Sequence, residues 1–149
     1  DLYATETKPP GGRFDATLEE VWHLVSNGWA IAYPAVFGID FEHPSRLTDA
    51  MDLARGGRFE FIPDVYPKNA WYTYEDETCD YSCQAMEYFY WALTSLLGGQ
   101  SAPGRAEEIA VEWGCPSLPS LKKRDPTVFM LLTSAQYSLP TKLPDGKYR

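Results

Sequence analysis

The chain has 149 residues and a formal net charge of -8 at pH 7. This length suffices for one domain with a substantial hydrophobic core, and the aromatic content of 15% argues against a disordered chain. The negative charge argues against nucleic acid as a partner, because phosphate binding requires a basic surface. No apolar run reaches the roughly 20 residues that cross a bilayer, so we expect no membrane insertion.

The N-terminal end is rich in proline and glycine. Residues 1–14 contain two consecutive prolines followed by two glycines, which neither continue a helix nor fit a central strand, so we expect an extended arm. A first helix is expected at about 18–27. Thr17 and Glu20 match a capping box at its start, and Gly28 is a common stop signal at its end.

The stretch from Cys79 to Gly98 organises the predicted fold. Between Ala85 and Leu97 nearly every side chain is apolar or aromatic on all faces, which predicts a central helix surrounded by the rest of the domain. Glu87 lies in the middle of this helix. A carboxylate in such surroundings requires a cation, a metal or a proton as its companion.

Further helices are predicted on both sides of the central one. They are expected at about 46–54, at about 105–113, and from Pro126 through Leu132, while residues 136–149 are expected to form an irregular, turn-rich tail. The sequence therefore predicts a mainly α fold. Residues 1–149 form a single compact helical domain in this prediction, with one central buried helix and irregular ends rich in proline and glycine.

The cysteines bear on the cellular compartment. Cys79 and Cys83 lie one helical turn apart at a predicted helix start, so they can form a disulfide if the first turn bends. We therefore expect an extracellular protein, with three reduced thiols as the alternative. Cys115 is then a buried thiol or an intermolecular bridge. Because the chain begins at Asp1 without a leader segment, we also expect a processed chain.

The informative local motif is Glu19-Glu20-Val21-Trp22-His23. On a helix, Glu19 and His23 project from the same face one turn apart, which is the spacing at which two side chains chelate one metal ion. Glu20 lies beside them and could orient or deprotonate a bound water. This segment resembles a degenerate H-E-x-x-H zinc-peptidase helix in which Glu19 replaces the first histidine.

The resemblance implies a metal site. In gluzincin-like families the third ligand is a glutamate on a later helix, and Glu87 matches it by residue type and apolar setting. Zinc would then be held by Glu19, His23 and Glu87, with Glu20 as the catalytic base of a hydrolase. The alternative is structural: the two N-terminal glutamates stabilise their helix, His23 is a surface or core histidine, and Glu87 forms a salt bridge or hydrogen bonds.

A second acidic group precedes the central helix and consists of Glu75, Asp76, Glu77 and Asp80. Carboxylates of this kind can bind Ca²⁺, but the EF-hand spacing is absent. The sequence favours a solvated acidic turn that stabilises the positive end of the following helix.

Two classes of function follow from these patterns. The first, which the sequence favours, is a secreted non-catalytic interaction or assembly protein whose partners are other protein chains, with self-association through the terminal arms. The second is a metal-binding, zinc metallopeptidase-like protein with hydrolase activity.

Overall fold

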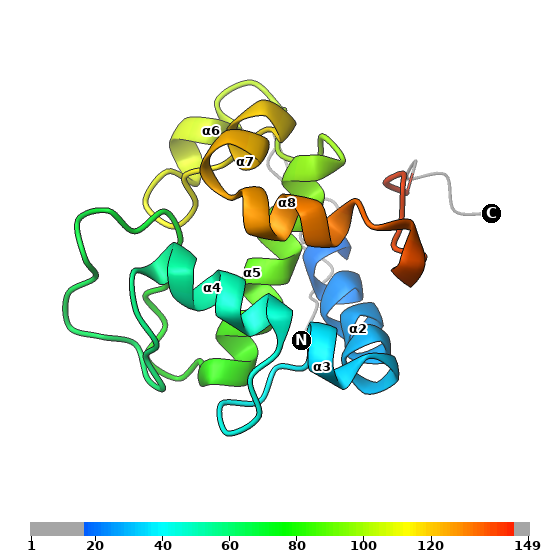
Figure 1. Cartoon of the computed structure of the whole chain (residues 1–149). Helices are drawn as coiled ribbons and strands as arrows, with labels where there is room; N and C mark the ends of the chain where they lie inside the picture. Colours follow the sequence, from blue (N-terminus) through cyan, green and yellow to red (C-terminus); the bar gives the residue numbers. More distant parts are fainter. Residues whose placement is uncertain (1–16, 145–149) are drawn as a thin grey trace.

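The computed structural model describes residues 17–144 and is mainly helical, with almost no strand (Figure 1). The elements are α2 (Thr17–Ala32), α3 (Pro34–Phe37), α4 (Arg46–Arg55), α5 (Tyr81–Leu96), α6 (Arg105–Glu108), α7 (Leu118–Arg124), α8 (Pro126–Leu132) and the short 3-10 helix η2 (Ala135–Tyr137). The predicted mainly α fold is thus confirmed. The expected arm at 1–14 and the last residues of the expected tail lie outside the described residues. Between residues 17 and 144, no helix combines the length and the apolar character needed to cross a membrane.

Helix α5 is the central element, as predicted. Asp80 is the N-cap residue that precedes its first turn, and its Oδ1 accepts the backbone N–H of Cys83 at 2.9 Å. Nearly all of its side chains from Gln84 onward are buried up to Ser95. Helices α2, α4, α7 and α8 all contact it and surround it in Figure 1. An apolar surface on every face of α5 requires this wrapping.

Arg55 fastens the end of α4 to α5. Its guanidinium is fully buried and donates from Nη1 to Oε1 of Gln84 at 2.6 Å, and from Nη2 to the carbonyl of Phe59. Oδ1 of Asp52 lies 3.7 Å from Nη2 of Arg55 and supplies the opposite charge. The chain then turns at Gly56 with a φ of 78°, a left-handed conformation that favours glycine. These contacts fix where the long loop between α4 and α5 begins.

Asp125 ties three segments together. Its Oδ2 accepts hydrogen bonds from Nε1 of Trp71 at 3.0 Å and from the hydroxyl of Tyr88 at 2.6 Å. Its Oδ1 accepts the backbone N–H of Val128 at 3.1 Å and thereby caps α8. The carboxylate is 1% exposed. One buried side chain therefore joins α8 to α5 and, through Trp71, to the α4–α5 loop.

Helix α2 is longer than predicted. It continues past Gly28 to Ala32 because tertiary contacts outweigh the weak helix propensity of glycine. Trp29, beyond the expected stop, lies 5.6 Å from Trp22 between ring centroids, and its Nε1 donates to the carbonyl of Tyr137 at 3.0 Å. The second of these contacts also attaches the C-terminal segment, where Tyr137, at the end of η2, and Leu139 are buried.

The region after α5 also differs from the prediction. Helix α6 ends at Glu108 instead of about 113, because the chain turns to bring Trp113 into an isolated antiparallel bridge with Tyr72. Helix α7 was not predicted. Its start carries a clear signal, since the Ser117 side chain accepts the backbone N–H of Ser120 in a capping box.

The predicted disulfide is confirmed. Cys79 and Cys83 are joined, with their Cα atoms 5.3 Å apart at the start of α5. Cys115 is a free, fully buried thiol. Burial and the nearby Asp125 carboxylate raise its pKa to about 12, which favours the thiol over the thiolate at neutral pH. Of the two alternatives for Cys115, the structure supports the buried thiol.

We predict that Asp125→Ala lowers the free energy of unfolding by about 3 kcal/mol, because it removes a helix cap and leaves two buried donors without an acceptor. Urea unfolding followed by circular dichroism measures this loss. The control is Asp49→Ala, an exposed acid in the first turn of α4, which should cost less than about 1 kcal/mol. Equal losses in the two variants would contradict the role assigned to Asp125.

Candidate metal centre

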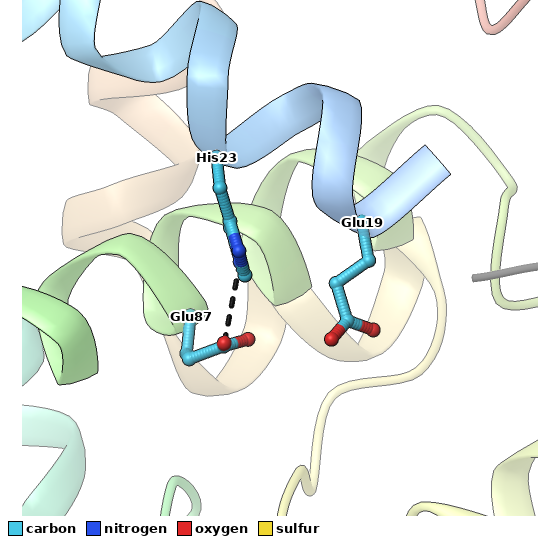
Figure 2. Close-up of side chains that lie close together, drawn as sticks. All are labelled: Glu19, His23 and Glu87. Atoms are coloured by element: carbon cyan, nitrogen blue, oxygen red, sulfur yellow. Dashed lines mark ion pairs between the residues drawn. The ribbon is translucent and has the colours of Figure 1, made fainter. Parts of the chain in front are cut away.

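Three predicted site residues come together between α2 and α5. Figure 2 shows the side chains of Glu19 and His23 descending from α2 toward Glu87 on α5. One ligand atom from each residue can be chosen so that all of them lie within 4.8 Å of one another. No other group of three or more histidine, cysteine, aspartate or glutamate side chains within residues 17–144 meets this distance criterion. The i, i+4 spacing on α2 and the central position of α5 produce this arrangement.

The contact between His23 and Glu87 has the length expected for two ligands of one ion. Nε2 of His23 lies 3.3 Å from Oε1 of Glu87, and the side chains are 22% and 8% exposed. Two ligands at ordinary distances from a tetrahedral Zn²⁺ are separated by about 3.4 Å. The buried Nε2 atom makes no regular hydrogen bond with any part of the chain that the structure describes. The imidazole nitrogen is thus placed for an ion pair or for a metal bond.

The electrostatics of the cluster reflect crowded negative charge. Burial, followed by the charge of Glu87, raises the pKa of Glu19 to about 7. For His23, burial acts to lower the pKa, but Glu87 and the other glutamates outweigh it and leave the pKa raised. The positive form of the imidazole is therefore favoured when no other cation is near. A divalent ion would compensate the same carboxylates more completely.

A pocket of about 250 Å³ opens beside the cluster. Its lining consists of Glu19, Tyr74, Glu87, Trp91, Arg105, Glu108, Ile109 and Glu112. Arg105 is the basic residue in this lining, and its Nη1 pairs with Glu108 at 2.9 Å while its Nε donates to Gln100 at 2.9 Å. The pocket thus gives a small ligand access to the carboxylates of Glu19 and Glu87.

Two pocket residues, Tyr74 and Glu112, were not predicted from the sequence. Burial and the charge of Glu87 raise the pKa of Tyr74, so its phenol remains a hydrogen-bond donor. Burial, followed by the charges of Glu87 and Glu19, raises the pKa of Glu112 to about 7. Both residues reach the pocket because the backbone N–H of Thr73 donates to the carbonyl of Glu112 at 2.9 Å. This long-range pairing leaves no local motif in the sequence.

Other candidate residues lie apart from the cluster. Glu20 is neither one of the clustered ligands nor a pocket-lining residue, although its charge contributes to the raised pKa values of Glu19 and His23. Its catalytic role stays a prediction. The other histidine, His43, is exposed and does not belong to the cluster. Its Nδ1 atom lies 3.4 Å from Oδ2 of Asp40.

The acidic group before α5 has local structural roles. Oδ1 of Asp76 accepts hydrogen bonds from the backbone N–H and the hydroxyl of Thr78, and Asp80 caps α5. Within the described chain, Glu75, Asp76, Glu77 and Asp80 form no group with the geometry of a metal site. The solvated acidic turn favoured by the sequence accounts for these contacts.

The chain matches no protein family, no curated protein and no solved structure at a significant level. The resemblance to zinc metallopeptidases therefore stays a hypothesis that rests on the residues of α2 and α5.

We predict that Glu112→Gln reduces the dependence of stability on pH. Because folding raises the pKa of Glu112 from 4.5 to about 7, the folded protein holds a proton that the unfolded chain has released over this interval. The free energy of unfolding of the wild type therefore falls as pH rises through it. The glutamine variant cannot titrate, so its stability should fall less between about pH 5 and about pH 8.

Urea unfolding across this pH range measures the difference between the two proteins. Glu42→Gln, at an exposed position away from the pocket, is the control and should follow the wild type. Parallel curves for the wild type and Glu112→Gln would show that the Glu112 carboxyl is not perturbed by folding.

Proposed function

We propose that this protein binds one divalent metal ion through Glu19, His23 and Glu87, with Zn²⁺ as the first candidate. The convergence of these three side chains from two helices to within 4.8 Å supports the proposal. Imidazole nitrogen and carboxylate oxygen are both ordinary ligands of Zn²⁺ in proteins. The donor set contains no sulfur, so it suits zinc and other divalent ions better than soft ions such as Cu(I).

A purely structural ion pair is the competing explanation, and it accounts for only part of the cluster. Such a pair requires His23 and Glu87 alone. Glu19 adds a second, partly buried carboxyl group, whose pKa is raised first by burial and then by the charge of Glu87. A structural pair leaves the position of Glu19 beside it unexplained, whereas a three-ligand metal site requires a third donor.

A site of this kind would support hydrolysis. A divalent ion held by Glu19, His23 and Glu87 would lower the pKa of a bound water and would polarise a substrate carbonyl or phosphoryl group. The adjoining pocket, which includes Glu19 and Glu87 in its lining, would admit the substrate. Hydrolase activity with Glu20 as general base is therefore the catalytic extension of the metal-binding proposal.

Secretion is part of the same proposal. The Cys79–Cys83 disulfide supports an oxidising compartment, because such bonds persist mainly outside the cytosol. The alternative role in assembly through terminal arms also stays a proposal, since the arm at 1–14 lies outside the described residues. The thiol of Cys115 is buried and is not available as a covalent link between chains.

We predict that the purified protein contains about one zinc ion per chain and that Glu87→Gln removes it. Zinc affinity should fall by more than about 100-fold, since even a residue that only orients a ligand contributes about 10- to 100-fold. Elemental analysis and titration with a competing chelator provide the measurement. Zinc should also stabilise the wild type by about 2.7 kcal/mol when its free concentration is 100 times the dissociation constant.

Matched variants separate a metal site from a structural pair. Glu19→Gln should lose zinc affinity while keeping the His23–Glu87 contact, and His43→Gln, which alters an exposed histidine outside the cluster, should change neither property. Circular dichroism checks that each variant is folded. A metal-free wild type whose stability does not respond to zinc would exclude the proposed site.

A further inference from the structure

A second and larger depression lies next to the metal pocket. It has a volume of about 660 Å³ and is formed by the loop between α4 and α5 together with the segment after α6. Its lining consists of Phe61, Ile62, Pro63, Asp64, Tyr66, Thr73, Tyr74, Glu75, Glu77, Val111 and Glu112, a set that we call the acidic groove. The volume lies within the range of about 300–1,000 Å³ that is typical of ligand sites.

Hydrogen bonds between its lining residues hold the acidic groove in shape. The hydroxyl of Tyr66 donates to the carbonyl of Tyr74 at 3.3 Å and accepts the backbone N–H of the same residue at 3.2 Å. The Thr73 hydroxyl donates to the carbonyl of Val111 at 2.7 Å, which joins the two walls. A ligand would therefore meet a surface that is already ordered, so the protein itself would lose little conformational entropy on binding.

The chemistry of the lining is negative and aromatic. Asp64, Glu75 and Glu77 contribute carboxylates, Glu112 adds a carboxyl group with a pKa of about 7, and none of the lining residues found in the described range is basic. Tyr66 and Tyr74 add aromatic side chains to the same lining. Carboxylates combined with aromatic faces favour a ligand with ammonium or guanidinium groups, through ion pairs and cation–π contacts.

The lining also includes exposed apolar side chains. Phe61 is 69% exposed and Val111 is 82% exposed. A partner that covers large exposed apolar side chains removes them from water, and this burial stabilises the complex. The ligand must then combine positive charges with apolar surface over several contact points, as a polypeptide segment does.

We propose that the acidic groove binds an extended, lysine- or arginine-containing segment of another polypeptide. Tyr74 and Glu112 line both the groove and the metal pocket, so the two depressions are neighbours that share these two side chains. Binding in the groove does not require the metal. Where the metal proposal also holds, the groove identifies basic polypeptides as the class of substrate brought to it.

The test uses a fluorescent eight-residue peptide in which lysine alternates with leucine, and the matched peptide with glutamate in place of lysine. Fluorescence anisotropy should show saturable binding of the lysine peptide alone. Glu75→Gln combined with Glu77→Gln should weaken binding by about tenfold, since partly exposed ion pairs each contribute modestly. Phe61→Ala, at an exposed position, should weaken binding without affecting the fold.

The control for charge is Glu42→Gln combined with Asp49→Asn, which changes the net charge equally at exposed positions outside the groove. Equal weakening in both double variants would overturn the proposal, because it would indicate nonspecific attraction. Competition by spermine as effective as that by unlabelled peptide would also overturn it, in favour of a small polyamine site. Zinc content should be unchanged in the groove variant, while Glu87→Gln should keep peptide binding, so the two proposals can fail independently.

Discussion

The burial of the Glu87 carboxylate is the constraint on which the site depends. Glu87 belongs to the helix that fills the centre of the domain, where an uncompensated charge costs several kcal/mol. Helix α2 packs against this helix so that His23 faces the carboxylate at 3.3 Å. Glu19 and Glu112 add two more carboxyl groups nearby, whose pKa values are raised to about 7 first by burial and then by neighbouring carboxylates, with Arg105 acting in the opposite direction. The result is a group of carboxyl ligands whose charged forms a divalent cation would stabilise.

Much of this arrangement could be predicted from local patterns. An apolar segment without a polar face indicates a helix that other helices surround, and α5 is that helix. A charged residue within such a segment needs a partner, and the four-residue spacing of Glu19 and His23 supplied the candidate. The one-turn spacing of Cys79 and Cys83 likewise indicated their bond. In each case the determining contacts are close in sequence or follow from one buried helix.

The remaining features depend on contacts between distant segments. Helix α2 passes Gly28 because Trp29 packs on Trp22 and bonds to the C-terminal segment. Glu112 enters the pocket because its carbonyl pairs with the 71–74 segment, about forty positions earlier in the chain. Hydrophobic periodicity and capping signals carry no information about such pairings. Local patterns placed α4 and α8 correctly to within one residue, but the ends of α2 and α6 and the entry of Glu112 into the pocket were beyond local reasoning.

The α4–α5 loop is attached to the helices independently of the Glu19, His23 and Glu87 cluster. Arg55 anchors the beginning of the loop, and Trp71 anchors it further along to Asp125, while the cluster belongs to α2 and α5. Substitutions, insertions or deletions between these anchors would alter the groove without moving Glu19, His23 or Glu87. The shape of the groove is therefore separable from the helical scaffold that holds the three clustered side chains, in the way that variable loops are carried by a rigid framework.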